Sequence, residues 1–316
     1  MATYLVTGGA GFIGSGLVEA LLKRHHEVRV LDNFSSGTVH NLREVQRDVV
    51  LIHGDIRDPE ACRKAVSGAD YVLHHAALSS VPQSVANPAA VHDVNVTGTL
   101  NILIAARDCG VKRVVLASSS AVYGNSPELP EVETLRPDPV SPYGVSKLFL
   151  ETYAGLFYQA YGLETISLRY FNVFGPRQDP DSQYAAVIPK FITALLGGRA
   201  PVIFGDGEQT RDFVFIEDVV QANLQACAAG LDACGRAYNV AGGERISVNR
   251  LVQEIGQLLN EQTEPLYEAA RPGDIRHSYA DISLSADLLN FRPEVSLRSG
   301  LSRTIAWYRE TVINDK

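Results

Sequence analysis

Residues 4–14 read YLVTGGAGFIG, and this stretch decides the fold of the chain. The apolar run at its start predicts a short strand, and Gly8, Gly11 and Gly14 predict a tight turn that opens a helix over residues 15–24. Backbone N–H groups at such a turn and the positive end of the helix dipole both favour a pyrophosphate. Glycine is required because a Cβ atom would block the turn, the approach of the phosphates or the packing of helix on strand.

A second signal follows that helix. Residues 28–31 (VRVL) predict another strand, and this strand ends in Asp32. A carboxylate about 20 residues beyond the glycines can accept hydrogen bonds from the ribose hydroxyls of an adenosine. It would also repel a 2′-phosphate, so the sequence favours NAD over NADP as the cofactor. The alternative is that Asp32 only stabilises a turn at the end of its strand.

The composition is that of a globular protein with a large core, because 46% of the 316 residues are hydrophobic and 20% are charged. The net charge of −8 and the lack of a basic block argue against nucleic acid as a partner. We find no signal peptide and no apolar run of membrane-spanning length, so we expect a cytoplasmic protein with no membrane partner. The cysteines have no metal-ligand spacing, so we expect reduced thiols and no metal site. They are Cys62, Cys109, Cys227 and Cys234.

Strand and helix patterns alternate along the chain, which predicts an α/β fold with a Rossmann-type, doubly wound parallel sheet. Further strands are expected at 49–53, 71–75, 113–117, 202–204 and 211–215, and helices at 59–66, 88–109, 142–161, 187–196 and 217–229. We therefore divide the chain into an NAD-binding domain (1–175) and a smaller α/β substrate-binding domain (176–316). Some segments of the second part are expected to return to the first.

Tyr143 and Lys147 are the candidate catalytic pair, because their i, i+4 spacing places them on one face of a predicted helix. The ordinary pKa of a tyrosine is about 10. The ammonium group and a positive nicotinamide ring would both favour the phenolate, so Tyr143 could act as a base near neutral pH. Ser119 ends a predicted strand and supplies a hydroxyl that could bridge the substrate and Tyr143. The alternative is a Tyr–Lys pair on the surface of an amphipathic helix.

Six motifs follow one another through most of the chain. They are TGGAGFIG (7–14), SSSAVYG (118–124), YGVSK (143–147), RYFNVFGP (169–176), RDF (211–213) and RPGD (271–274). With these motifs the chain resembles the extended short-chain dehydrogenase/reductases, and among them the UDP-hexose 4-epimerases. The first and third motifs mark the superfamily, and the last three mark its nucleotide-sugar members. The family pattern selects Ser119, four residues before Tyr123, over its neighbours Ser118 and Ser120.

The resemblance implies that NAD is the cofactor. The residues that it assigns to NAD are Gly8, Gly11, Phe12, Ile13, Gly14, Asp32, Asn33, Ser35, Ser36, Gly37, Asp55, Ile56, Ala76, Ala77, Ser79, Asn95, Tyr143, Lys147 and Phe171. Phe12 and Ile13 are expected at the pyrophosphate, Asp55 at the adenine and Phe171 beside the nicotinamide. Ser79 departs from the family pattern, in which lysine is frequent at this position, and this weakens its assignment.

The resemblance also implies a UDP-hexose as the substrate. The residues that it assigns to the substrate are Ser119, Asn172, Val187, Phe204, Arg211, Val248, Arg271, Asp274 and Ser278. The two arginines suit the oxygens of the diphosphate, and Asp274 is expected on the ribose of the uridine. The implied reaction oxidises C4 of the sugar with tightly held NAD while Tyr143 takes the hydroxyl proton. The 4-keto sugar then rotates about its diphosphate and takes the hydride back on the other face.

Ser278 bears on the choice of sugar. It lies four residues after Asp274, where some family members carry a tyrosine that closes the pocket against a 2-acetamido group. A small side chain here predicts that UDP-GlcNAc and UDP-GalNAc are accepted, together with UDP-Glc and UDP-Gal. The alternative is that Tyr279 fills the same space.

Other functions on the same fold stay open. Ser120 and Ala121 occupy positions where related dehydratases and decarboxylases carry an acid, and this favours epimerisation. The alternatives are a UDP-glucuronate 4-epimerase or another nucleotide-sugar oxidoreductase, and more distantly a non-catalytic NAD-sensing regulator, a class that tends to lose the tyrosine–lysine pair. The resemblance further implies a homodimer formed through the helices predicted at 88–109 and 142–161.

Overall fold

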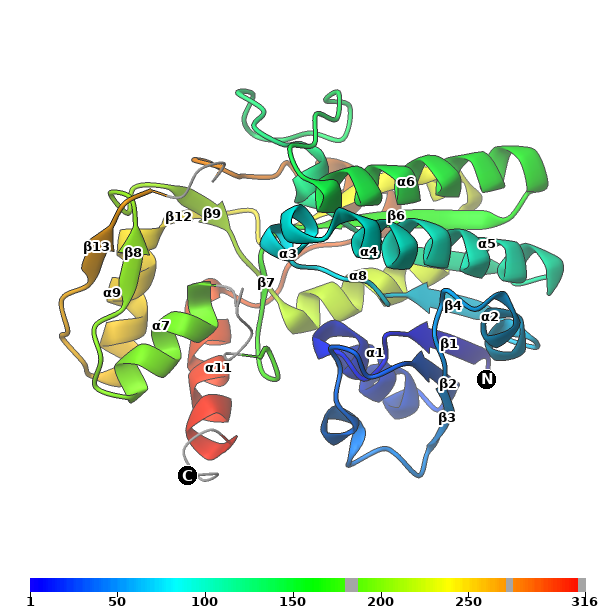
Figure 1. Cartoon of the computed structure of the whole chain (residues 1–316), viewed down its shortest axis with the longest axis horizontal. Coiled ribbons are helices and arrows are strands. Elements are labelled where there is room, and N and C mark those ends of the chain that lie inside the picture. The colour runs from blue at the N-terminus through cyan, green and yellow to red at the C-terminus, as the bar shows by residue number, and fades with distance from the viewer. Residues whose placement is uncertain (180–186, 271–274, 312–316) are drawn as a thin grey trace.

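A parallel sheet forms the centre of the molecule (Figure 1). The computed structural model describes residues 1–179, 187–270 and 275–311. Over these residues the sheet has seven strands in the order β11-β6-β5-β4-β1-β2-β3, and every neighbouring pair is parallel. The strands are β1 (Thr3–Thr7), β2 (Glu27–Asp32), β3 (Val49–His53), β4 (Tyr71–His74), β5 (Arg113–Ser119), β6 (Glu164–Tyr170) and β11 (Arg236–Val240). β2 and β3 are added on one side of β1, whereas β4 and the later strands are added on the other side. In open α/β sheets a ligand crevice lies where the strand order switches in this way, here between β1 and β4.

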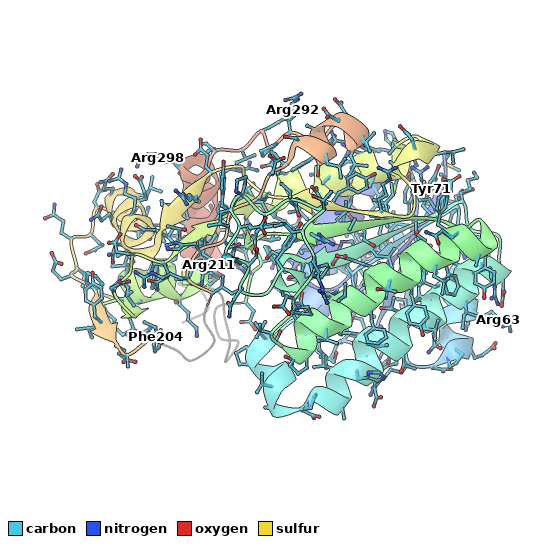
Figure 2. All side chains as sticks on the ribbon, turned by 90° about the horizontal axis from the view of Figure 1, so that it is seen from above. Arg63, Tyr71, Phe204, Arg211, Arg292 and Arg298 are labelled. Atoms are coloured by element: carbon cyan, nitrogen blue, oxygen red, sulfur yellow. The ribbon has the colours of Figure 1, made fainter. Side chains whose placement is uncertain are left out.

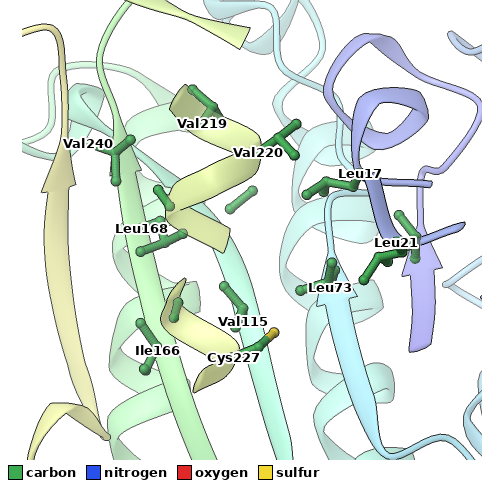
Figure 3. Close-up of a cluster of buried hydrophobic side chains, with 14 of the residues drawn as sticks. Leu17, Leu21, Leu73, Val115, Ile166, Leu168, Val219, Val220, Cys227 and Val240 are labelled. Carbon is green, nitrogen blue, oxygen red and sulfur yellow. The ribbon is translucent and has the colours of Figure 1, made fainter. Parts of the chain in front are cut away.

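Helices cover both faces of the sheet, as the predicted doubly wound fold requires. One face packs on α1 (Phe12–Lys23) and α8 (Ile216–Ala228). Figure 3 shows this core, in which Leu17 and Leu21 of α1 and Val219 and Val220 of α8 meet the sheet. The other face packs on α2 (Pro59–Val66), α5 (Gly98–Asp108) and α6 (Pro142–Tyr161). The central strands read as nearly continuous apolar runs because both of their faces are buried.

A smaller α/β part lies beside the sheet and has its own core (Figure 1). Its helices are α7 (Val187–Leu196), α9 (Val248–Leu259) and α11 (Leu297–Thr311). Short strands pair around them as β8 (Val202–Phe204) with β13 (Leu266–Glu268), β9 (Thr210–Asp212) with β12 (Arg245–Ser247), and β7 (Val173–Phe174) with β10 (Val214–Phe215). The remaining helical elements are η1 (Val39–Leu42), α3 (Val81–Ala86), α4 (Pro88–His92), η2 (Asp93–Thr97), η3 (Ser120–Val122), η4 (Leu231–Ala233) and α10 (Ser283–Leu289).

Two predicted elements differ in detail from the structure. The helix expected at 88–109 is divided by η2, a π-helical turn. The strand expected at 211–215 is two strands, because β9 pairs with β12 whereas β10 pairs with β7. β11, which was not predicted from the sequence, pairs with β6, and α8 packs on the sheet. The division of the chain at residues 175 and 176 stays a prediction.

Within the described residues, no helix has both the length and the apolar character needed to cross a membrane.

Candidate active site

The glycine turn between β1 and α1 is shaped for an anion. Gly8 has a φ of +68°, and a Cβ atom there would lie 2.7 Å from the amide nitrogen of Ala76 at the end of β4. A Cβ atom on Gly14 would lie 2.1 Å from the carbonyl oxygen of Gly8, so only glycine lets α1 pack this close to the turn. Gly11 caps α1 without a side chain, and no acidic residue occurs in the first turn. The first N–H groups of α1 are therefore available to the negative charge of a pyrophosphate.

Asp32 lies at the end of β2, where the sequence predicts a ribose ligand. Its buried carboxylate accepts hydrogen bonds from the N–H groups of Ala10, at 2.9 Å, and Phe34, at 2.8 Å. Asp32 therefore stabilises the glycine turn and the loop after β2, as the alternative interpretation holds. It also lines a cavity at the carboxyl ends of the strands, so the structure allows both roles.

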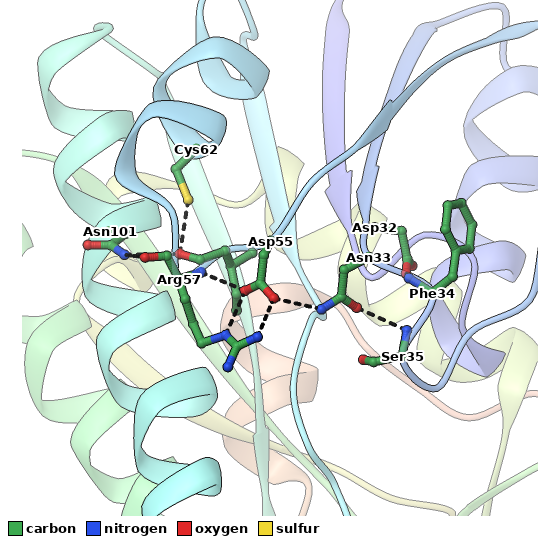
Figure 4. A network of polar contacts seen from close by, with 9 residues as sticks. Asp32, Asn33, Phe34, Ser35, Asp55, Arg57, Cys62 and Asn101 are labelled. Atoms are coloured by element: carbon green, nitrogen blue, oxygen red, sulfur yellow. Dashed lines mark hydrogen bonds and ion pairs between the residues drawn. The ribbon is translucent and has the colours of Figure 1, made fainter.

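A polar network lies at the end of this cavity where the sequence predicts the adenosine (Figure 4). Asn33 donates to Asp55 at 2.8 Å, and Arg57 forms an ion pair with Asp55 at 2.7 Å. The hydrogen bond from Arg57 is the largest influence on Asp55, and it holds the pKa of this carboxyl well below its usual value. Asp55 therefore stays ionised and can accept hydrogen bonds from a nucleoside.

One cavity collects most of the residues assigned to NAD. It runs along the carboxyl ends of the strands from the glycine turn to α6. The assigned residues that line it are Gly8, Gly11, Phe12, Ile13, Gly14, Asp32, Asn33, Ser35, Ser36, Gly37, Asp55, Ile56, Ala76, Ala77, Ser79, Tyr143 and Lys147. The uncapped start of α1 and the acceptors at the end of β2 fit a dinucleotide placed across this edge.

Two residues assigned to NAD lie outside the lining of this cavity. Asn95 is buried in η2, where its amide binds both backbone groups of Leu78 and donates to the hydroxyl of Ser146. Leu78 lines the cavity, so Asn95 supports the wall from behind. The ring of Phe171 is fully buried against Tyr123, so the side-chain position expected beside the nicotinamide is corrected. Phe171 directly follows β6 and its ring packs in the core, whereas the preceding residue, Tyr170, lines the cavity.

The cavity also contains residues that the sequence did not assign. They are Leu31, Gly54, His75, Leu78, Val94, Ala117, Ser118 and Tyr170. Tyr170 ends β6, and its hydroxyl lies 2.9 Å from Nε2 of His75 at the end of β4. Several of these residues end parallel strands, so the rule that ligands bind at the carboxyl edge would have found them.

Tyr143 and Lys147 line the cavity, and Ser119 follows Ser118, which lines it as well. Tyr143 and Lys147 are buried on one face of α6, and Nζ of Lys147 lies 5.7 Å from the centre of the phenol ring. Ser119 hydrogen-bonds the side chain of Tyr143, whereas Ser118 donates to Glu151 instead. The structure therefore places the expected serine, and not its neighbour, beside the tyrosine.

The protein alone does not make Tyr143 acidic. Burial raises its pKa, and the hydrogen bond from Ser119 offsets only part of this rise. The expectation that Lys147 lowers this pKa is therefore not met without the cofactor. Burial lowers the pKa of Lys147 itself to about 8, opposed by the carboxylate of Glu151. The ammonium donates to the carbonyl oxygen of Ala117 at 2.7 Å.

A second cavity holds most of the residues assigned to the substrate. Asn172, Val187, Phe204, Arg211 and Val248 line it. Figure 2 shows Phe204 and Arg211 in the smaller part of the molecule, away from Tyr71 and Arg63. Ser79 lines both cavities, so they meet there.

Arg271 and Asp274 lie outside the described residues, so their assignments stay predictions.

Ser278 does not line either cavity. It is buried, and its hydroxyl donates to Oε2 of Glu131 at 3.1 Å. Tyr279 lines a separate surface groove, where its ring lies 5.9 Å from the guanidinium carbon of Arg245. The alternative that Tyr279 fills the space beside Ser278 therefore has no support in this arrangement.

Comparisons with known proteins agree with this geometry. The model of the NAD dependent epimerase/dehydratase family matches residues 4–241. The chain is 38% identical to the UDP-glucose 4-epimerase of Mycolicibacterium smegmatis, covering 96% of this chain and 98% of the relative. It is 35% identical to the UDP-glucuronate 4-epimerase of Thermodesulfobacterium geofontis, covering 99% and 98%.

A solved structure is similar over almost the whole chain. It is the UDP-N-acetylglucosamine 4-epimerase from Methanobrevibacter ruminantium M1 in complex with UDP-N-acetylmuramic acid. The TM-score is 0.94 at 42% identity, with 98% of each chain covered. The glycine turn, the cavity at the strand ends and the buried Tyr–Lys pair all lie within residues 4–241, which match the family model. The chain belongs to the NAD dependent epimerase/dehydratase family, and NAD is its cofactor.

Proposed function

We propose that this protein is a UDP-sugar 4-epimerase. The observation that carries the proposal is the junction of the two cavities at Ser79. One cavity presents Tyr143 and Lys147 next to a dinucleotide site, and the other presents Asn172 and Arg211, which suit a diphosphate. A sugar held by its diphosphate in the second cavity would reach the tyrosine of the first.

The side chains have separate tasks in this reaction. When bound, NAD supplies a hydride acceptor that also returns the hydride. Tyr143 takes the proton of the C4 hydroxyl and later gives it back, and Ser119 holds both oxygens in line. Lys147 keeps positive charge beside the phenol, which favours the phenolate once substrate is present. The 4-keto sugar turns about its diphosphate between the two transfers, so the product differs only in the configuration at C4.

We propose that acetylated and non-acetylated sugars are both accepted. The small side chain of Ser278 is hydrogen-bonded to Glu131, and the ring of Tyr279 lies near Arg245. Neither side chain is therefore expected to block the space for a 2-acetamido group. The similarity to a UDP-N-acetylglucosamine 4-epimerase supports this choice. A UDP-glucuronate substrate is the second candidate, because a relative with that activity covers the same length of chain.

Proton NMR of the C4 configuration tests the function. Purified protein is incubated separately with UDP-GlcNAc, UDP-Glc and UDP-GlcA, and Tyr143→Phe serves as the inactive control. We expect conversion of the first two sugars and none of the third. Conversion of UDP-GlcA alone would show that the protein is a UDP-glucuronate 4-epimerase, the second candidate. The Ser278→Tyr variant should lose UDP-GlcNAc and keep UDP-Glc, and equal loss of both would exclude a role of residue 278 in sugar choice.

We also propose a homodimer formed through α5 and α6. Val145, Phe149 and Leu156 are exposed on α6 at spacings of four and seven residues, so they share one helix face, and Ile104 of α5 is exposed as well. Apolar side chains gathered in this way mark an interaction surface. Light scattering should give twice the mass of one chain for the wild type and the mass of one chain for Phe149→Asp. Leu266→Asp is the control, because Leu266 is exposed but does not lie on α5 or α6, and this variant should stay a dimer.

We further propose that residues 1–175 and 176–316 act as cofactor and substrate domains, and that the protein works in the cytoplasm. NAD dependence and four unpaired cysteines support the location in the cytoplasm. Fractionation of cells that carry a tagged copy tests it.

A further inference from the structure

A short strip of backbone links the substrate cavity to the rest of the molecule. Residues 276–281 lie between β9 and the loop that contains Glu131, and we call them the 276–281 strip. On one side, Thr210 donates to the carbonyl oxygen of Arg276 at 2.9 Å and accepts from the N–H of Ser278 at 3.1 Å. On the other side, Glu131 donates to Tyr279 at 2.7 Å and accepts from Asp281 at 2.9 Å through its backbone. Because Arg211 follows Thr210 on β9 and lines the cavity, the strip sets the position of a cavity residue.

Glu131 holds the strip through its side chain as well. The residue is only 2% exposed, and its carboxyl accepts the hydroxyl of Ser278 at 3.1 Å. Burying a carboxyl group is costly unless it is hydrogen-bonded or neutral. The reaction described above does not use Glu131, so its burial calls for another explanation.

A second buried carboxyl group lies nearby on β9. Asp212 is fully buried and accepts from the N–H groups of Gly242, at 2.8 Å, and Ala280, at 3.3 Å. Ala280 belongs to the strip, so Asp212 and Glu131 bind the same segment from two sides. Burial raises the pKa of both groups to about 7, and the charge of Asp212 adds to the rise at Glu131.

We propose that Glu131 is a positioning residue for the substrate, which with Asp212 holds the 276–281 strip and thereby the side chain of Arg211 in the substrate cavity. The inference rests on the proposed function, since it concerns the cavity assigned to a UDP-sugar. Glu131 does not line that cavity, so it acts through the strip and not by contact with the ligand.

The charges around the pair give the inference a pH dependence. From β9, Asp212 repels a negative Glu131, and Arg211 attracts it. From the strip, the hydroxyl of Ser278 and the N–H of Tyr279 favour its ionised form, and Glu244 repels Asp212. Near neutral pH the pair keeps a proton. Above about pH 7 both groups ionise, and their repulsion loosens the hold on the strip and on β9.

Calorimetric titration of UDP tests the inference without turnover. The dissociation constant is measured from pH 6.5 to 9 for the wild type, Glu131→Gln, Glu131→Ala and Glu133→Gln. Glu133 is the matched control, because it lies in the same loop and accepts from the backbone N–H of Asn239 in β11 instead of from the strip. KM and kcat for UDP-Glc are measured in parallel over the same pH range.

We expect the wild-type dissociation constant to rise severalfold above pH 7 and that of Glu131→Gln to stay flat. Glu133→Gln should keep the wild-type profile, and Glu131→Ala should bind UDP more weakly at every pH. KM should change more than kcat in the Glu131 variants. Superposable profiles for wild type and Glu131→Gln, or the same flattening in Glu133→Gln, would overturn the inference. Should Glu131→Ala not fold, Glu131→Gln decides. A wild type that binds UDP as expected but epimerises no sugar would contradict the proposed function alone.

Discussion

Arg169 and Glu151 form an ion pair with 2.7 Å between Nη2 and Oε2, and both side chains are more than nine-tenths buried. Glu151 lies one helical turn beyond Lys147 and also accepts the hydroxyl of Ser118. It thus ties α6, which carries the catalytic pair, to β5 and β6, which end at the cofactor cavity. The pair fixes the three elements that must stay in register for proton transfer.

Removing Glu151 should destabilise the protein strongly. The Glu151→Ala variant leaves Arg169 buried without its counter-charge, and breaking a buried pair from one side costs about 3–5 kcal/mol. Chemical denaturation measures the free energy of unfolding. The comparison is Glu60→Ala, which breaks the exposed pair with Arg63 and should change the stability little. An equal loss of unfolding free energy in the two variants would show that the buried ion pair stabilises the fold no more than the exposed one.

Replacing Tyr143 with phenylalanine should abolish proton transfer and keep the fold. General acid–base catalysis contributes on the order of 10²–10⁴-fold, so kcat should fall by this factor while KM changes little. The control is Tyr153→Phe, a tyrosine on the same helix that does not line the cavity. If the kcat of Tyr143→Phe stays within tenfold of the wild-type value, Tyr143 does not transfer the proton.

The Ser119→Ala variant should shift the pH profile of activity upward. Tyr143 must lose its proton to act as a base, so activity rises with pH through its pKa. Burial raises this pKa and the hydrogen bond from Ser119 lowers it, so losing the hydroxyl moves the rising limb to higher pH. The pH dependence of kcat/KM measures the shift. A limb that stays in place, or moves to lower pH, would contradict this contact.

A methyl group at position 14 should disrupt the glycine turn. In Gly14→Ala the Cβ atom would meet the carbonyl oxygen of Gly8 at 2.1 Å, and the backbone has to shift. We expect a loss of stability of at least about 1–3 kcal/mol and a loss of bound NAD. Gly155→Ala is the control, because its Cβ atom would lie 3.4 Å from the nearest atom and alanine favours the helix. Thermal unfolding and NAD content after gel filtration compare the two variants.

The sequence predicts strands β1 to β5 of the sheet and the glycine turn, because these follow from local rules, but it does not predict β6 and β11. A strand, a glycine turn, a helix and an acid at the end of the next strand occur within the first 32 residues, so little depends on distant contacts. The positions of Gly8 and Asp32 on one cavity follow from the rule that parallel strands end at a common edge.

The contacts that the sequence misses depend on side-chain direction and on segments far apart in the chain. Asn95 belongs to an expected helix, but a π-helical turn directs its side chain into the protein. Phe171 follows the end of β6, and its ring packs in the core. The bond between Ser278 and Glu131 joins residues 147 positions apart, and no local pattern indicates it. The raised pKa of Tyr143 results from burial, which depends on the complete fold.

The return of β11 to the sheet has a consequence for biosynthesis. β11 pairs with β6, and α8 covers the core face that contains Leu17 and Leu21. On the ribosome, the seven-stranded sheet therefore cannot be completed until residue 240 has emerged, because β11 ends there. A nascent chain stopped at residue 175 would expose the edge of β6 and an uncovered apolar layer, and both are surfaces that chaperones recognise.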